Sequence, residues 1–310
     1  MSPAFIRICS LVIGLIVCIA IPNMIIIYLA YIILLESSIK EINMFSWIYD
    51  NIICYILKTL PFKDNIRTVF IDKNALDKTN QYILCLHPHG LACQGRILNL
   101  INPKLPAHTY FSNAYQAVHS TSFAIPLVRE ILLLGKSVPA NENMLSKCIR
   151  DGRNISIYPG GVKEMDYCKQ RKQASEKYDY YYLSKHKGFI RLSQKHNIPL
   201  VPIVFWNEQR AFTYKSSGIV AQINRFITSI SGISSSINFF QVLTLKNMKS
   251  LINILSNDID ENELAVYIGE PILFTGMTID AAHTEYINKL KRLYAYAKEQ
   301  EKSDRVLVIK

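Results

Sequence analysis

Short apolar runs of strand length alternate with segments of helical periodicity from about residue 80 onward. The strand-like runs are Tyr82–Leu86, Thr109–Phe111, Asn154–Tyr158, Ile198–Phe205 and Leu264–Tyr267. The helical patterns are Pro126–Leu134, Met144–Arg150, His186–His196 and a stretch with apolar spacing between Ile287 and Ala297. Strands separated by helices are typical of an α/β sheet. We therefore expect an α/β domain in this part of the chain.

The first strand-like run ends abruptly in the sequence His87-Pro88-His89-Gly90. Open α/β sheets place ligands at the carboxyl ends of their strands. Proline stiffens the turn, and glycine allows a close approach to the backbone. An imidazole held there can act as a general base near neutral pH. A metal site or a purely structural turn is the alternative, but no complete zinc ligand set is recognisable around the two histidines, so metal is the weaker interpretation.

Further motifs follow this turn in a fixed order. They are Phe123–Pro126 leading into Arg129-Glu130, Leu134-Gly135, Tyr158–Gly161 followed by Glu164, Lys187–Phe189 with Arg191, Leu200–Ile203 with Asn207-Glu208, and Gly269–Ile272 ahead of His283 and Tyr286. Together with the histidine turn, the series resembles the diacylglycerol acyltransferase 2 family, which includes monoacylglycerol and wax-ester acyltransferases. The resemblance covers roughly residues 80 to 300, with a loose stretch near 210–260.

The resemblance implies a glycerolipid-acyltransferase-like mixed sheet flanked by helices. It also implies a membrane-bound enzyme that transfers a fatty acyl group from acyl-CoA to the hydroxyl of diacylglycerol or monoacylglycerol, forming triacylglycerol without a cofactor. A lysophospholipid or fatty-alcohol acceptor is the enzymatic alternative. The non-enzymatic alternative is a lipid-droplet or membrane-shaping protein without activity. The intact His87–Gly90 and Gly160–Glu164 motifs argue against this alternative. The implied location is the endoplasmic reticulum membrane with the catalytic domain facing the cytosol, or a lipid droplet.

Attack of an alcohol on a thioester needs a base and a donor for the developing oxyanion. The resemblance assigns the base to His89 and makes His87 a supporting hydrogen-bond partner. Many related glycerolipid acyltransferases pair a histidine with an aspartate separated by four residues, and this chain lacks that spacing. An orienting carboxylate must therefore come from elsewhere. Glu164 and Glu130 are the candidates, and for Glu130 a salt bridge to Arg129 is the alternative.

The expected substrate-binding residues belong to the matched motifs or are basic residues beside them. They are Pro88, Gly90, Arg129, Pro159, Gly160, Gly161, Lys163, Lys187 and Arg191. The turn at Gly160-Gly161 can present backbone N–H groups to an acyl oxygen or a phosphate, or can be only a tight turn. Lys163 replaces the small apolar residue common in the family and can attract a phosphate of CoA or of the acceptor, which keeps a lysophospholipid acceptor open. Lys187 and Arg191 lie four residues apart and form either a CoA phosphate site or a solvated basic face.

The N-terminal stretch from Ile8 to Leu35 contains no charged residue, and about 20 apolar residues suffice to span a bilayer. Pro22-Asn23 interrupts it, so a single tilted span and a hairpin both remain open. The resemblance favours a hairpin with both flanks in the cytosol. The amphipathic segment Glu41–Leu60 is either an interfacial helix or a core helix. We therefore expect a membrane anchor at 1–40, an interfacial region at 41–75 and an acyltransferase domain at 76–310.

The chain has 35 Lys and Arg residues and 24 Asp and Glu residues, so its formal net charge is 35 − 24 = +11. No basic run with interleaved aromatic residues indicates nucleic acid binding, so membrane and anionic acyl-CoA are the expected partners. Seven scattered cysteines without CxxC spacing indicate reduced thiols facing a cytosol. The segment 209–262 is interpreted as a loop over an acyl tunnel or a second membrane contact. The oligomeric state is not readable.

Overall fold

The computed structural model describes residues 39–59, 66–90, 93–124, 128–161, 163–164, 177–183, 185–209 and 264–310. The uncharged N-terminal stretch and almost all of the segment 209–262 lie outside the described residues, together with the expectations attached to them.

Seven strands form one sheet in the order β1-β8-β7-β2-β5-β3-β4. They are β1 (Arg67–Phe70), β2 (Ile83–His87), β3 (Ala114–Val118), β4 (Ser137–Pro139), β5 (Asn154–Ile157), β7 (Leu200–Trp206) and β8 (Ala265–Ile268). Neighbouring strands run parallel, except that β8 is antiparallel to β7. Every residue of β2 and β7 is buried, as expected of central parallel strands covered on both faces. The expected mixed sheet is therefore confirmed.

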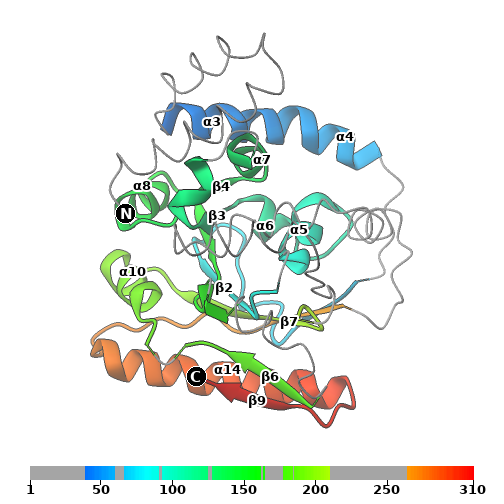
Figure 1. The fold of residues 1–310 in the computed structure, drawn as a ribbon, viewed down its shortest axis with the longest axis vertical. Coiled ribbons are helices and arrows are strands. Elements are labelled where there is room, and N and C mark those ends of the chain that lie inside the picture. Colours follow the sequence, from blue (N-terminus) through cyan, green and yellow to red (C-terminus); the bar gives the residue numbers. More distant parts are fainter. Residues whose placement is uncertain are drawn as a thin grey trace, which may run out of the picture.

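Helices cover both faces of this sheet (Figure 1). They are α3 (Ile39–Ile48), the π-helical turn η2 (Tyr49–Ile53), α4 (Cys54–Thr59), α5 (Gln94–Ile101), α6 (His108–Ser112), the 3-10 turn η3 (Ser120–Ala124), α7 (Val128–Leu134), α8 (Glu142–Arg150), α10 (Gly188–His196) and α14 (Ile279–Gln300). The short strands β6 (Tyr178–Tyr181) and β9 (Val306–Ile309) form a separate parallel pair beside α14 (Figure 1). The four predicted helical patterns correspond to α7, α8, α10 and α14. Asn141 caps α8 by accepting a hydrogen bond from the Met144 amide at 2.9 Å.

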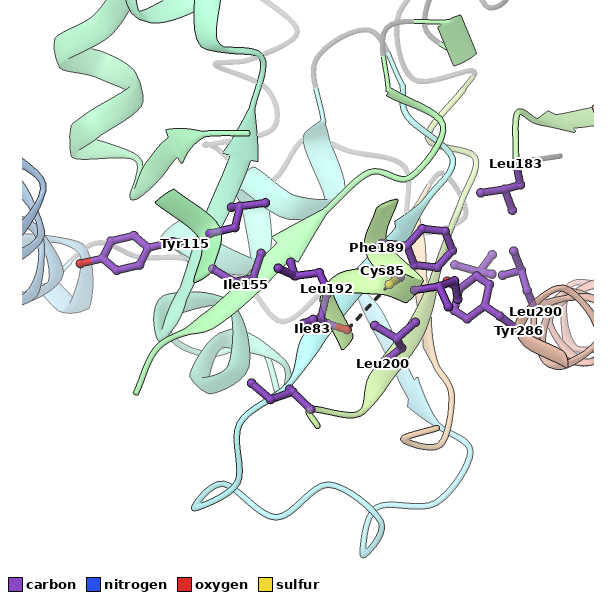
Figure 2. Close-up of a cluster of buried hydrophobic side chains, with 14 of the residues drawn as sticks. Ile83, Cys85, Tyr115, Ile155, Leu183, Phe189, Leu192, Leu200, Tyr286 and Leu290 are labelled. Carbon is purple, nitrogen blue, oxygen red and sulfur yellow. Dashed lines mark hydrogen bonds between the residues drawn. The ribbon is translucent and has the colours of Figure 1, made fainter. Parts of the chain in front are cut away.

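The sheet separates two apolar cores, because side chains alternate between its faces along each strand. Ile83 and Cys85 of β2 face a core built with α8, α10 and α14, where they meet residues such as Phe189 and Tyr286 (Figure 2). Leu84 and Leu86 face the other core, beneath α5 and α6. The same alternation places His87, the last residue of β2, on the α14 side of the sheet.

One predicted strand is wrong. Thr109–Phe111 lies in the short helix α6, and the strand that follows it is β3. Tyr110 and Phe111 are adjacent and both belong to the core beneath α5. Adjacent residues of a strand would point to opposite faces, so a helical turn is needed to bury both side chains on the same side.

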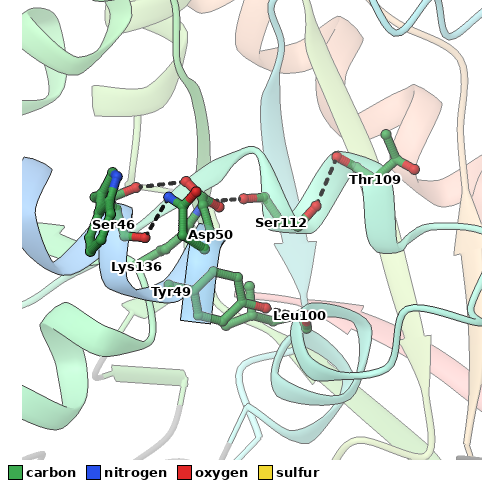
Figure 3. Close-up of polar contacts among 9 residues, drawn as sticks. Ser46, Tyr49, Asp50, Leu100, Thr109, Ser112 and Lys136 are labelled. Atoms are coloured by element: carbon green, nitrogen blue, oxygen red, sulfur yellow. Dashed lines mark hydrogen bonds and ion pairs between the residues drawn. The ribbon is translucent and has the colours of Figure 1, made fainter. Parts of the chain in front are cut away.

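A continuous helical segment made of α3, η2 and α4 lies across the domain. Its inner face is attached by polar contacts (Figure 3): the Tyr49 hydroxyl donates to the Leu100 carbonyl at 2.6 Å, and the buried Lys136 ammonium lies 2.5 Å from an Asp50 carboxylate oxygen. Its outer face exposes large apolar side chains, which are Met44, Trp47, Ile52, Tyr55 and Ile56. The segment is therefore a surface helix with an apolar outer face. Among the described residues, no helix has both the length and the apolar composition required to cross a bilayer.

Candidate active site

The two histidines of the turn after β2 have different surroundings. His87, the last residue of β2, is fully buried on the α14 side, where its Nε2 lies 2.8 Å from the Tyr286 hydroxyl. Its ring stacks on Tyr181 with 5.4 Å between ring centroids. Burial lowers the pKa of His87 to about 3, so this imidazole is neutral at physiological pH. His87 is thus a core residue beneath the turn, and its expected supporting role remains a prediction.

His89 is only partly buried and follows a cis peptide bond between His87 and Pro88. Its Nδ1 lies 2.7 Å from the carbonyl oxygen of Gly90. A carbonyl can only accept, so Nδ1 carries the proton and Nε2 carries the lone pair. The ring packs against Tyr158, with 4.6 Å between centroids. The turn therefore presents an imidazole whose tautomer suits a general base.

Glu164 holds the backbone of this turn. Its carboxylate accepts hydrogen bonds from the His89 amide at 2.9 Å and from the Tyr182 amide at 3.3 Å. A Cβ on Gly160 would lie 2.5 Å from a Glu164 carboxylate oxygen, so only glycine leaves room for this arrangement. Burial raises the pKa of Glu164 to about 7, and the contacts with His89 and Tyr182 oppose the rise. Glu164 thus fixes the position of His89 through its backbone rather than through its ring.

Glu208 belongs to the motif series, but the sequence analysis assigned it no role in the site. It is buried, and it accepts hydrogen bonds from the amides of Gln94 at 2.6 Å and Gly95 at 2.7 Å, at the start of α5. A Cβ on Gly90 would lie 2.6 Å from Glu208 Oε1, so Glu208 packs directly against the histidine turn. Burial raises the pKa of Glu208 to about 7, and the two amides and His89 oppose this rise. Its position just after the buried strand β7, which is paired with β2, was the signal that could have identified it.

A cysteine also lies beside His89. The Cys93 sulfur is 3.9 Å from both ring nitrogens of His89. Burial, followed by the nearby Glu208 charge, raises the pKa of Cys93 to about 12. The thiolate is the nucleophilic form of cysteine, so this thiol is not suited to covalent catalysis near neutral pH. The arrangement favours direct proton transfer by His89 over a cysteine–histidine mechanism.

The Pro159–Gly161 turn follows β5, which pairs with β2, and lies beside the histidine turn. Gly160 contacts Glu164, and the Gly161 amide donates to the Tyr158 carbonyl at 3.0 Å. Lys163 is exposed and lies over the Tyr182 ring, with its ammonium 5.3 Å from the centroid. The structure therefore gathers Gly90, Glu164, the glycine turn and Lys163 around His89.

The other expected basic residues lie on helices. Arg129 forms an ion pair with Glu130 at 3.0 Å, which is the alternative considered for Glu130. The Lys187 ammonium, at the start of α10, lies 2.5 Å from an Asp280 carboxylate oxygen at the start of α14, and Arg191 is exposed. His186, next to Lys187, contacts the Pro159 carbonyl, which places the beginning of α10 near the glycine turn. Within the described part of the chain, no three His, Cys, Asp or Glu side chains are grouped so that they could hold a metal ion.

The two buried carboxyl groups make stability depend on pH. Their folded pKa of about 7 lies above the ordinary value of 4.5, so the protein favours their protonated forms. Their contribution to folding is complete below pH 4.5 and is lost as pH rises through 7. We expect the melting temperature of purified protein in detergent to fall between about pH 5 and about pH 8. In Glu164→Gln the melting temperature should fall less steeply with pH. An unchanged fall would contradict the raised pKa of Glu164. The variant Glu270→Gln, at an exposed position, serves as the control.

A family model described as diacylglycerol acyltransferase matches residues 15–310. Diacylglycerol O-acyltransferase 2 of Xenopus laevis is 24% identical over 255 residues, covering 75% of this chain and 65% of the relative. The human protein of that name is 23% identical over 247 residues, covering 75% and 61%. Diacylglycerol O-acyltransferase 2B of Umbelopsis ramanniana is 22% identical over 277 residues, covering 81% and 74%. The chain therefore spans slightly less than two thirds of the length of most of these relatives, and no solved structure matches it. Because the family model covers nearly the whole chain, the protein belongs to the diacylglycerol acyltransferase family.

Proposed function

We propose that this protein is an acyl-CoA-dependent O-acyltransferase that acylates the hydroxyl of diacylglycerol, forming triacylglycerol. The observation that carries the proposal is the state of His89, whose Nδ1 proton is tied to the Gly90 carbonyl so that Nε2 is the basic nitrogen. The family membership and the names of the relatives support the choice of acyl donor and acceptor.

In the proposed reaction, His89 Nε2 takes the proton of the acceptor hydroxyl as its oxygen attacks the thioester carbonyl carbon. A tetrahedral intermediate forms, and the former carbonyl oxygen carries the negative charge. The oxyanion then collapses and the carbon–sulfur bond breaks. The imidazolium gives its proton to the departing sulfur, so CoA leaves as the free thiol and His89 is neutral again. Glu164 holds the amide of His89 itself and Glu208 holds the start of α5 next to the turn, which keeps the ring within reach of the hydroxyl.

Basic residues near the glycine turn suit the phosphates of CoA. Lys163 lies beside Glu164, and Lys187 with Arg191 begins α10, whose start lies near Pro159. Lys163 is also the reason to keep a second acceptor class in the test, because its exposed ammonium can bind a phosphate on a lysophospholipid. Monoacylglycerol and fatty alcohols are further acceptors to compare.

We further propose that the protein is bound to the endoplasmic reticulum membrane, with the domain in the cytosol. The uncharged stretch Ile8–Leu35 supports an anchor. The outer face of α3 and α4 supports contact with the lipid surface, because it exposes Trp47 and Tyr55, residues favoured at the interface between lipid and water.

Microsomes that contain the protein should transfer label from radioactive acyl-CoA to diacylglycerol. The panel should compare diacylglycerol, monoacylglycerol, a fatty alcohol and a lysophospholipid, with neutral and phosphorylated products separated. The protein should also remain in the membrane pellet after an alkaline carbonate wash. Label found only in phospholipid would reject the neutral acceptor, and protein released by the wash would reject the anchor. Microsomes without the protein provide the background.

A further inference from the structure

Arg96 is a buried cation whose N–H groups are not fully used. It lies on α5 with 4% of its surface exposed, and its Nε and Nη2 have no hydrogen-bond partner in the described part of the chain. The Tyr158 hydroxyl is also buried; the thiol of Cys93 lies beside it, and it has no nitrogen or oxygen partner in the same part of the chain. Folded proteins rarely leave such groups unpaired, and exceptions often belong to a binding or catalytic site.

Both groups lie next to the proposed base. The Tyr158 ring contacts the His89 ring, and Cys93, which also contacts His89, lies one turn before Arg96 along the chain. Burial raises the pKa of the Tyr158 hydroxyl, and the Arg96 charge opposes that rise. Burial lowers the pKa of Arg96, and the neighbouring Tyr158 opposes this fall. The guanidinium, the hydroxyl and the imidazole therefore belong to one cluster.

Several backbone amides that could otherwise bind an oxyanion are already occupied. The His89 amide donates to Glu164, and the Gln94 and Gly95 amides donate to Glu208. The Gly161 amide of the glycine turn donates to the Tyr158 carbonyl. The N–H groups of Arg96 and the Tyr158 hydroxyl, whose only neighbour of this kind among the described residues is the weakly accepting Cys93 thiol, are therefore better placed for this task than these amides.

We propose that Arg96 and Tyr158 form the oxyanion-binding subsite for the thioester carbonyl. This inference rests on the proposed acyl transfer. When the alcohol oxygen bonds to the carbonyl carbon, the electron pair of the C=O bond moves to oxygen, and this oxygen accepts hydrogen bonds from the guanidinium and the hydroxyl. When the pair returns, the carbon–sulfur bond breaks and CoA leaves. Donors that are buried and fixed before the reaction stabilise such charge more than donors in water.

The subsite makes stability and activity respond in opposite directions. A buried cation with unused donors destabilises the fold, so an apolar side chain of similar length should stabilise it. We expect Arg96→Met to raise the melting temperature by about 2 to 4 °C. The same variant should lower kcat by about 10² to 10³ and change the acyl-CoA KM little, because the interaction forms in the transition state.

The test compares purified wild type, Arg96→Met, Arg96→Lys and Tyr158→Phe in detergent with lipid and labelled acyl-CoA. Arg96→Lys keeps a cationic donor and should recover part of the lost kcat. Tyr158→Phe keeps the ring against His89 and removes only the hydroxyl, so kcat should fall by ~10². The exposed Arg150→Met, on α8, controls for loss of a positive charge and should match wild type in kcat and melting temperature.

Each outcome decides a separate point. A raised acyl-CoA KM at unchanged kcat in Arg96→Met would show that Arg96 binds a phosphate of CoA, and would overturn the proposal. A lowered melting temperature together with lost activity would make Arg96 a structural residue and would also overturn it. Wild-type kinetics in both Arg96→Met and Tyr158→Phe would also overturn the proposal. If wild type itself transfers no acyl group, the proposed function fails first, and only an active wild type tests the subsite.

Discussion

Replacing His89 by alanine should lower kcat for acyl transfer by a factor of about 10² or more, the effect of losing a general base. The physical reason is that the Nδ1 proton is held by the Gly90 carbonyl, which leaves Nε2 to accept the hydroxyl proton. The measurement is the initial rate of triacylglycerol formation from labelled acyl-CoA, normalised to protein abundance. His196→Ala is the matched control, because His196 is partly buried and hydrogen-bonded to Ser146 on another helix.

The His87 variant separates chemistry from packing. His87→Ala should lose less activity, and its loss should be accompanied by a lower melting temperature, because the buried ring stacks on Tyr181 and bonds to Tyr286. His89→Ala, in contrast, should keep a melting temperature close to that of wild type. An unchanged rate in His89→Ala at equal abundance would contradict the base assignment.

Replacing Glu208 by alanine should lower the free energy of unfolding by about 3 kcal/mol or more. Two buried amides, those of Gln94 and Gly95, would lose their acceptor, and each unsatisfied buried donor costs about 1–3 kcal/mol. Activity should fall as well, because the start of α5 and the adjacent histidine turn would shift. The measurement is chemical or thermal unfolding of purified protein, combined with the acyl transfer rate at a temperature where the variant remains folded.

Two further substitutions make the Glu208 result specific. Glu208→Gln keeps one acceptor oxygen and resembles the protonated carboxyl that burial favours, so it should lose less stability than Glu208→Ala. Glu270→Ala removes an exposed carboxylate and should change the free energy of unfolding by no more than about 0.5 kcal/mol. Equal stability of Glu208→Ala and Glu270→Ala would show that the carboxylate does not hold α5.

Local patterns were sufficient for several features of this protein. The run Tyr82–Leu86 predicted β2, and the histidine turn at its carboxyl end predicted the location of the candidate site. The helices α7, α8, α10 and α14 followed from their helical patterns. The predictions of the strand and of the helices succeeded because strand and helix periods depend on neighbouring residues. The site at the carboxyl end of β2 remains a prediction.

Other features were decided by contacts between distant residues. Thr109–Phe111 has a strand-like composition, yet the core beneath α5 needs Tyr110 and Phe111 on the same side, which only a helix provides. Glu208 lies 114 residues after Gln94 in the chain, and its role appears only once β7 pairs with β2. The unused donors of Arg96 could not be predicted either, because burial and hydrogen bonding depend on how the whole chain packs. The sequence by itself therefore determined the strand, the turn and the proposed base, while tertiary packing alone decided which carboxylates hold the turn and which donors surround it, since those contacts join segments far apart in the chain.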